Sequence, residues 1–299
     1  MRVFVTGATG HIGSLVVPEL IKAGHEVVGL ARSDRSAAAL TAAGAETHRG
    51  TLDDPDSLSK AAAAADGVIH LAFIHDFNAH VDAAAIDLRA IEAIGAALEG
   101  SGKPFVVTSG TAGLLPGRVL TEQDAPAAAE AASPRVASEN TAIALAERGV
   151  RSTAIRLAPS VHGPADSHGF VPRLISIARE KGASAYVGDG SNRWPAVHEL
   201  NAARLYRLAL ESAPAGTRLH GVGDEGIAFA DIADAIGRRL DLPVVSISRD
   251  EAADRFGFLG ALVAADIPAS STATQALLGW QPEHPGLIAD LETGHYFTA

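Results

Sequence analysis

The chain has 299 residues, 47% hydrophobic and 20% charged, which is typical of a globular protein and not of a disordered or fibrous one. Its net charge is −11 and it has no Lys/Arg cluster, which argues against nucleic acid or an anionic membrane as a partner. The absence of cysteine excludes disulfides, thiolate metal sites and cysteine nucleophiles, and favours the reducing cytoplasm. We find no signal-peptide pattern and no apolar run of about 18 residues, so we expect no transmembrane helix.

The first half of the chain alternates short apolar runs with helical stretches. Strands are expected at 2–6, 26–31, 45–50, 67–73, 104–110 and 151–157. Helices are expected between them at 14–24, 36–44, 57–65, 79–99 and 134–149. This alternation predicts a parallel sheet with right-handed crossovers and helices on both faces. We therefore expect a doubly wound α/β (Rossmann) core over residues 1–158.

Residues 159–299 follow a looser pattern. Helices are expected at 199–212, 229–240 and 271–278, whereas the Gly-, Pro- and His-rich segments 162–170 and 186–199 are expected to be loops. We predict a small substrate-binding region here, with elements that return to the first core. It should cover the carboxyl edge of the sheet, where doubly wound folds bind ligands.

The first expected strand runs directly into a glycine-rich turn. Gly7, Gly10 and Gly13 have the spacing G-x-x-G-x-x-G and precede an amphipathic helix. Such glycines allow a tight turn, let backbone amides reach a pyrophosphate, and let the helix pack near the strand. The helix N-terminus adds partial positive charge. The turn therefore predicts a dinucleotide site, with a purely structural glycine turn as the alternative.

The end of the second expected strand bears on the choice of dinucleotide. An NAD site usually places a carboxylate there to bond the ribose 2′-hydroxyl. Ala31 stands near that place, and Arg32, Ser33 and Arg35 follow. An arginine with a hydroxyl suits a 2′-phosphate, so NADP(H) is favoured over NAD(H). The alternative is that Arg32 stacks on adenine or pairs with Asp34.

TGATGHIG resembles the TGxxGxxG fingerprint of the extended short-chain dehydrogenase/reductase superfamily, whose members include the NAD-dependent epimerases and dehydratases. GVIHLAF, VVTSGTAG, IRLAPSVHGP, VGDGSNRWPAVHELNAARL and LLGWQP resemble further segments of that superfamily, so the likeness runs nearly end to end. It implies a Rossmann domain, a small substrate-binding domain, a nicotinamide cofactor and a homodimer. It also implies cofactor contacts from Thr9, His11, Ile12, Leu52, Leu71, Ala72, Phe73, Thr108 and Pro159. Thr51 and Asn201 stand where the superfamily usually has Asp.

The resemblance breaks at the superfamily's catalytic Tyr-x-x-x-Lys pair. The chain has three tyrosines, and none is followed four positions later by lysine. In the helix predicted to start at Ser133-Pro134, Arg135 aligns with the Tyr place and Glu139 with the Lys place. The chain therefore resembles an atypical branch of the superfamily. An ordinary surface ion pair between these two residues is the alternative.

Other side chains are candidates for the chemistry. Ser109 and Thr111 follow the fifth expected strand and can hold a substrate oxygen, unless they only cap a turn. His75, just past the fourth, can act as an acid near neutral pH, unless it is a structural loop histidine. Arg135 stays charged, so it can bind a carboxylate or polarise a carbonyl but is a poor acid.

The substrate side offers three further candidates. His162 and His168 flank the loop after the sixth expected strand, and Trp194 either lines the substrate pocket or covers core. We expect no metal site, because the histidine spacings are irregular and no H-E-x-x-H motif occurs.

Three functions compete on this basis. The favoured one is an NADPH-using reductase of a small organic carbonyl, enone or imine, with a proton donor other than tyrosine. The alternative is a catalytically silent dinucleotide sensor. Lyase or epimerase chemistry with a retained cofactor would normally need the missing base.

Overall fold

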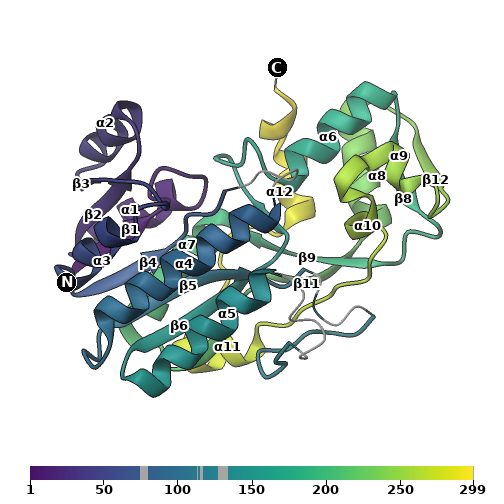
Figure 1. Ribbon diagram of the computed structural model, residues 1–299. Coiled ribbons are helices and arrows are strands. Elements are labelled where there is room, and N and C mark those ends of the chain that lie inside the picture. The colour runs from purple at the N-terminus through teal and green to yellow at the C-terminus, as the bar shows by residue number, and fades with distance from the viewer. Residues whose placement is uncertain (75–79, 113, 115–116, 127–133, 299) are drawn as a thin grey trace.

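A seven-stranded sheet forms the centre of the larger part of the protein, in a computed structural model that describes residues 1–74, 80–112, 114, 117–126 and 134–298. Its strands are β1 (Arg2–Thr6), β2 (Glu26–Ala31), β3 (Glu46–Arg49), β4 (Gly67–His70), β5 (Pro104–Gly110), β6 (Arg151–Leu157) and β10 (Thr217–Gly221). They lie in the order β10-β6-β5-β4-β1-β2-β3, and all neighbours are parallel (Figure 1). This confirms the predicted doubly wound fold.

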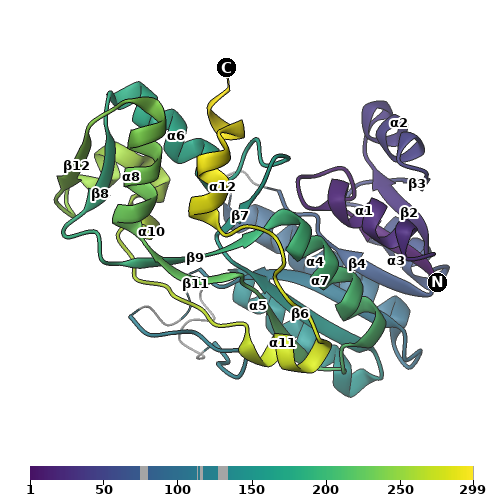
Figure 2. The same cartoon turned by 180° about the vertical axis from the view of Figure 1, so that it is seen from behind.

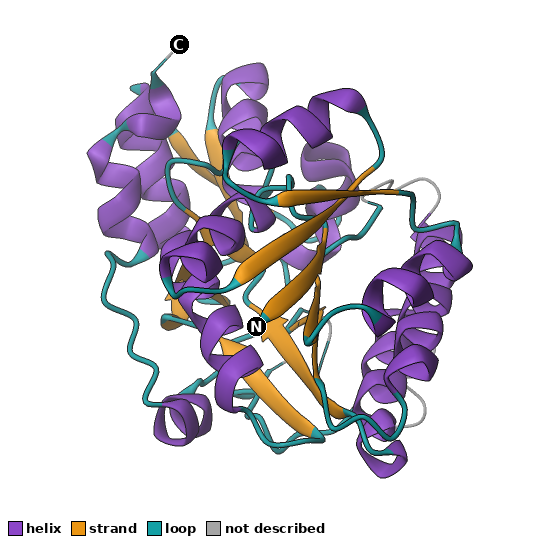
Figure 3. Cartoon of the chain, turned by 90° about the vertical axis from the view of Figure 1, so that its left-hand side faces the viewer, coloured by secondary structure: helices purple, strands orange, loops and turns teal. Residues whose placement is uncertain are grey.

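Helices cover both faces of this sheet, and the strands lie between two helix layers (Figure 3). One face carries α3 (Pro55–Ala63), α4 (His80–Leu98) and α5 (Pro134–Ala144), and the other carries α1 (Gly13–Lys22), α2 (Asp34–Ala42) and α7 (Glu199–Ser212) (Figures 1 and 2). Successive side chains of β1 point to opposite faces of the sheet, and both faces are apolar, so each face needs a helix layer to cover it. Phe4 packs in one apolar cluster with Leu58 of α3, whereas Val3 and Val5 pack in another with Leu205 of α7.

The sequence order of the strands reverses beside β1. From β1 the chain builds outward through β2 and β3, and then returns to β4 on the other side. The crossovers on the two sides of this point lie on opposite faces, so the carboxyl ends of β1 and β4 form a switch point. A ligand site is expected at this edge.

The remaining elements form a smaller lobe with its own apolar cluster. It contains two small sheets, in the order β11-β9-β7 and β12-β8, built from β7 (Ser160–His162), β8 (Ser184–Val187), β9 (Arg193–His198), β11 (Asp224–Ala228) and β12 (Val244–Ile247). Its helices are α6 (Phe170–Lys181), α8 (Phe229–Leu240), α9 (Ala252–Phe256), α10 (Gly260–Val263) and α12 (Leu287–Thr293). The lobe also contains the short 3-10 helices η3 (Gly257–Leu259) and η4 (His295–Phe297), whereas η2 (Leu145–Arg148) follows α5 and packs on the large sheet.

Part of the second half of the chain returns to the large sheet. β10 pairs with β6 at its edge, α7 packs on α1, and α11 (Thr272–Leu278) packs on α7 and β10 (Figure 2). The two halves of the chain therefore share one core.

The prediction that 186–199 is a loop is wrong. Residues 193–198 form β9, the central strand of the three-stranded sheet. Pro195 made this segment look unlike a strand, because proline cannot donate to a ladder. The pairing with β11 shifts register between Asp224 and Ile227, so Pro195 lies opposite a β-bulge and its missing N–H is tolerated there.

Element boundaries differ from expectation elsewhere by a few residues. The strand expected at 67–73 ends at His70. The helix expected at 134–149 begins at Pro134 and gives way to η2 after Ala144. Among the helices of the described residues, none has both the length and the apolar character that a membrane span requires.

Candidate functional site

The turn between β1 and α1 needs its glycines because backbone segments approach closely there. Gly7 has φ +67°, and a Cβ on it would lie 2.6 Å from the backbone nitrogen of Ala72. A Cβ on Gly13 would overlap the carbonyl oxygen of Gly7, so glycine lets α1 pack against the loop. Gly10 is exposed, and its amide donates to the carbonyl of Gly7 at 2.9 Å. The spacing therefore follows from backbone packing.

The start of α1 fits an anion. Its N-cap residue, Ile12, makes no side-chain cap hydrogen bond. The amides of Ser14, Leu15 and Val16 donate to backbone carbonyls, whereas within the described residues those of Ile12 and Gly13 have no acceptor. Thr9 and Gly10 are exposed beside these amides. A helix N-terminus with free amides and an open backbone suits the pyrophosphate of a dinucleotide.

The end of β2 presents two arginines to solvent. Arg32, Ser33 and Arg35 are all exposed, and Ser33 caps α2. Asp34 pairs with Arg49 at 2.6 Å, so the alternative in which Arg32 pairs with Asp34 is wrong. Within the part of the chain that the structure describes, neither the Arg32 nor the Arg35 side chain has a hydrogen bond or ion pair.

The segment after β4 lies against the glycine turn. The amide of Leu71 donates to the carbonyl of Thr6 at 3.2 Å, and the amide of Ala72 donates to Thr6 Oγ1 at 3.3 Å. Below it, His70 Nε2 donates to Asp87 Oδ1 at 3.1 Å, which leaves Nδ1 to accept from Thr6 Oγ1 at 2.8 Å. Buried side chains thus fix the end of β1 to the end of β4.

Arg135, at the place of the superfamily's tyrosine, lies at the ends of β4 and β5. Its guanidinium carbon lies 4.1 Å from the centroid of the Phe73 ring, and Nη2 donates to the carbonyl of Thr108 at 3.4 Å. These contacts hold a permanent positive charge at the ends of β4 and β5.

Glu139, at the place of the superfamily's lysine, is bound elsewhere. Its buried carboxylate accepts from Arg156 Nη2 at 2.6 Å and from Arg218 Nε at 2.7 Å. The alternative of a surface ion pair between Arg135 and Glu139 is therefore wrong. Burial works to raise the pKa of Glu139, but Arg156, Arg218 and Ser109 together hold this pKa below its usual value.

Ser109 is oriented by this carboxylate. Its Oγ donates to Glu139 Oε2 at 2.7 Å, so its single hydroxyl hydrogen is used and only its lone pairs remain for a ligand. Thr111 is buried and its Oγ1 donates to the carbonyl of Leu157 on β6 at 3.4 Å. Neither side chain caps its own turn.

Three further predicted cofactor contacts, Thr108, Leu52 and Pro159, differ in their partners and burial. Thr108 Oγ1 donates to the carbonyl of His70 at 2.8 Å and accepts from the buried hydroxyl of Tyr206 at 2.8 Å. Leu52 packs against an apolar cluster, and Pro159 is half-buried between β6 and β7.

Two of the three predicted substrate contacts are buried. Trp194 is fully buried against Phe229 and donates Nε1–H to the carbonyl of Leu262, which favours the alternative that it covers core. His162 is also fully buried, with Nδ1 2.9 Å from Asp290 Oδ2. Only His168 is exposed.

His75 lies outside the described residues. Within those residues, no three His, Asp or Glu side chains gather as a metal site would require. His11 stays a predicted cofactor contact through its place in the turn, and its ring Nε2 lies 2.8 Å from Glu199 Oε2 on α7.

Sequence reasoning missed the partners of these charged residues. A signal was present for Arg156, since a charge inside an apolar strand needs a buried counter-charge. No local pattern indicated which carboxylate would supply it, because Glu139 lies 17 positions away on a helix.

Comparison with known proteins finds relatives that span nearly the whole chain. An uncharacterized protein of Schizosaccharomyces pombe is 50% identical over 299 residues, which is 99% of this chain and 100% of that protein. The 4-hydroxy-2-methyl-3-oxo-4-farnesyl-3,4-dihydroquinoline-1-oxide ketoreductase of Stigmatella aurantiaca is 29% identical over 223 residues, 72% of this chain and 66% of the enzyme.

A solved structure shows the same fold. DesIV, a dTDP-glucose 4,6-dehydratase from Streptomyces venezuelae with NAD and TYD bound, superposes with a TM-score of 0.78 at 18% identity, over 99% of this chain and 98% of that one. The sequence model of one family, described as the NAD dependent epimerase/dehydratase family, matches residues 3–220. The resemblance to the extended short-chain dehydrogenase/reductases is confirmed, and this chain belongs to the NAD dependent epimerase/dehydratase family.

Proposed function

We propose that this protein is an NADPH-dependent reductase of a small organic carbonyl, enone or imine, in which Arg135 binds the atom that gains negative charge. The observation that carries the proposal is the place of Arg135, a permanently charged donor held between Phe73 and Thr108 where the superfamily has its tyrosine. The ketoreductase of Stigmatella aurantiaca supports reduction as the direction.

The proposal assigns a separate chemical role to each group of the site. When bound, the nicotinamide supplies the hydride. Arg135 donates a hydrogen bond to the substrate oxygen or nitrogen and stabilises its developing charge. The guanidinium keeps its protons, so the proton must come from another group. His75 stays a prediction for that role.

None of the three tyrosines takes the superfamily's role in this proposal. Burial raises the pKa of Tyr206, whose hydroxyl bonds Thr108. Tyr296 accepts from the amide of Gly163 and donates to Asp166, and burial raises its pKa too. Tyr186 lies on β8 of the smaller lobe.

The preference for NADPH rests on Arg32, Ser33 and Arg35, exposed at the end of β2 with no carboxylate at Ala31. A 2′-phosphate there would meet two unpaired guanidinium groups. The homodimer and the cytoplasmic location stay predictions.

The test of the function is a panel of ketones, enones and imines with NADPH, followed by loss of absorbance of the reduced nicotinamide. We expect turnover with at least one class, and a fall in kcat on the order of 100-fold in Arg135→Gln. Arg89→Gln, on an exposed position of α4, is the matched control and should keep full activity. Tight NADPH binding without turnover on any compound would favour the silent sensor.

The cofactor preference has its own test. Arg32→Asp should weaken NADPH binding by about tenfold or more and leave NADH affinity nearly unchanged, since one charge-assisted pair is lost. Equal effects on both dinucleotides would contradict the assignment of Arg32 to the 2′-phosphate.

A further inference from the structure

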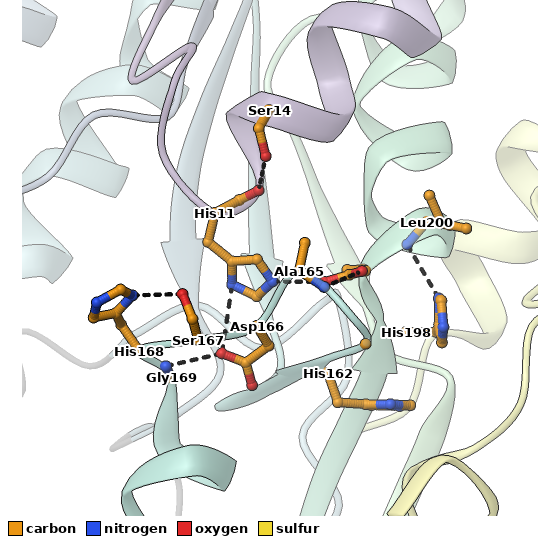
Figure 4. Close-up of polar contacts among 12 residues, drawn as sticks. His11, Ser14, His162, Ala165, Asp166, Ser167, His168, Gly169, His198 and Leu200 are labelled. Carbon is orange, nitrogen blue, oxygen red and sulfur yellow. Dashed lines mark hydrogen bonds and ion pairs between the residues drawn. The ribbon is translucent and has the colours of Figure 1, made fainter. Parts of the chain in front are cut away.

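Two buried carboxylates face the side chain of His11, which lies inside the dinucleotide turn. His11 Nε2 is 2.8 Å from Glu199 Oε2, and Nδ1 is 3.9 Å from Asp166 Oδ1. The side chains of Glu199 and Asp166 are only 3% and 1% exposed. Figure 4 shows the imidazole above Asp166, with Ser14 Oγ bonded to the backbone of His11.

The other hydrogen-bond partners of the cluster are neutral, while His198 at the N-cap of α7 is a further titratable group whose charge acts to lower the pKa of Glu199. Glu199 also accepts from the amide of Ala165 at 2.9 Å. Asp166 accepts from the amide of Gly169 at 2.8 Å and from the Tyr296 hydroxyl at 3.0 Å. Among the described residues, no lysine or arginine forms a hydrogen bond or ion pair with either carboxylate.

This arrangement places two carboxylates beside one imidazole, so a single added proton decides whether the contact with the second carboxylate is favourable. The carboxylate of Glu199 can only accept, so Nε2 carries a hydrogen. In a neutral ring Nδ1 then has a lone pair and no hydrogen, and it lies 3.9 Å from Asp166 Oδ1, so this approach is unfavourable without a further proton. A proton on Nδ1 or on Asp166 removes the repulsion. Burial, together with the charge of Glu199, raises the pKa of Asp166, although the charge of His11 opposes this.

The cluster is also close to where a dinucleotide would bring negative charge. His11 lies between Gly10 and Gly13, whose backbone fits a pyrophosphate. Added negative charge beside buried carboxylates favours the protonated form of the cluster. We propose that Glu199 and Asp166 are positioning residues of the dinucleotide site, that they act through a proton shared with His11, and that dinucleotide binding draws this proton into the cluster.

The cluster joins the two parts of the site. Asp166 belongs to the 163–169 segment, which also contains the exposed His168, and Glu199 begins α7. Tyr296, in η4, holds the amide of Gly163 and the carboxylate of Asp166. Uptake of the proton therefore strengthens the attachment of the 163–169 segment to the dinucleotide turn. This inference rests on the dinucleotide site of the proposed function and extends it to the segment on the substrate side.

The experiment is isothermal titration calorimetry of the full-length protein with NADPH and with NADH, in buffers of different ionisation enthalpy, between pH 7 and pH 8.5. The dependence of the heat on the buffer gives the protons taken up per dinucleotide. NADH separates the cluster from the 2′-phosphate, which titrates near pH 6 (about one unit below this range). We expect uptake of up to one proton, and affinity that falls by up to about tenfold per pH unit as pH rises.

A second histidine–glutamate pair, His25 with Glu211 of α7, provides a control variant. His11→Gln keeps a donor for Glu199 but cannot take up a proton, so uptake should be lost. Asp166→Asn should reduce the number of protons taken up per dinucleotide. In His25→Gln, the replaced ring lies 3.0 Å from Glu211 and away from the turn, so uptake should be unchanged. The wild-type protein offers an independent measurement, since the NMR pKa of the Asp166 carboxyl should rise further when NADH binds.

The outcomes separate this inference from the proposed function. Binding heat with no dependence on buffer, or equal uptake in wild type and His11→Gln, overturns the shared proton. No binding heat with either dinucleotide overturns the dinucleotide site itself, and this inference with it.

Discussion

The side chain of Glu139 shows how one residue changes the chemistry open to a familiar site. A lysine at its place would add positive charge beside the cofactor ribose. Glu139 instead balances Arg156, which is fully buried on β6, and Arg218 on β10. Such a pair is held because removing one member leaves an unpaired buried charge. The same carboxylate takes the hydrogen of Ser109, so only the lone pairs of Ser109 remain for a ligand, and the proposed function assigns the donor role to Arg135.

Glu139→Gln should therefore destabilise the protein strongly at neutral pH. We expect a loss of about 3–5 kcal/mol, or roughly 10 °C in Tm, because Arg156 is left without its counter-charge. The folded pKa of Glu139 is lowered, so its ionised form stabilises the fold fully above its unfolded pKa of about 4.3. Below the unfolded pKa, the wild type progressively loses the stabilisation from ionised Glu139 as pH falls through the folded pKa of Glu139.

The measurement is Tm against pH for the wild type and the variant. The difference should be constant from pH 6 to 8 and should narrow as pH falls below about 4. A difference that is the same at every pH would mean that the ionised carboxylate is not the source of the stability.

At the scale of elements, the turn and α1 act as one unit because their glycines permit contact between backbones. The position of α1 depends on Gly13, which packs on the carbonyl of Gly7, and the position of the turn depends on Gly7 against Ala72. Side chains elsewhere in α1, such as Leu20, then lock this geometry into the core. The anion site is therefore a consequence of how the helix is seated.

Gly13→Ala should displace α1 and weaken dinucleotide binding. A Cβ there meets backbone atoms, which cannot rotate away, so we expect NADPH affinity to fall on the order of tenfold and stability to fall by about 1–3 kcal/mol. Gly223→Ala is the matched control, because its Cβ would meet ordinary contacts of 3.5 Å or more. Calorimetry gives the NADPH affinity of both variants, and thermal melts give their stability. Unchanged NADPH affinity in Gly13→Ala would show that the turn tolerates a displaced α1.

At the scale of the whole molecule, the two halves of the chain complete each other. The apolar cluster on one face of the large sheet includes Val3 and Leu20 from the first half and Tyr206, Leu219 and Trp280 from the second. β10 pairs with the edge of β6 that faces away from β5. The predicted Rossmann segment 1–158 therefore lacks an edge strand and α7, one of the helices on the face that also carries α1 and α2.

A fragment that ends at residue 158 should not fold alone. Without α7, α11 and β10 it would expose the apolar face that these elements cover, and Glu139 would lose Arg218. We expect no cooperative thermal transition and no NADPH binding, whereas the full chain shows both. A cooperative transition in the fragment, measured by circular dichroism, would show that residues 1–158 form an independent domain.

Much of the large sheet could be predicted because its signals are local. The strands at 2–6, 26–31, 104–110 and 151–157 form at the predicted residues, since apolar runs bounded by turn residues need no distant partner to be recognised. β9 could not be recognised in this way. Its proline is tolerated only because β11 forms a bulge opposite it.

The doubly wound fold, the glycine-rich turn and the absence of a Tyr-x-x-x-Lys pair can all be recognised in the amino-acid sequence, because each depends on spacing within a short segment. Which charged residues come together depends on how the chain folds. Arg156 and Arg218 come to Glu139, and Glu199 and Asp166 come to His11, across up to 188 positions. The physical reason is that a buried charge must find a partner in space, and chain folding sets that neighbour without regard to sequence distance.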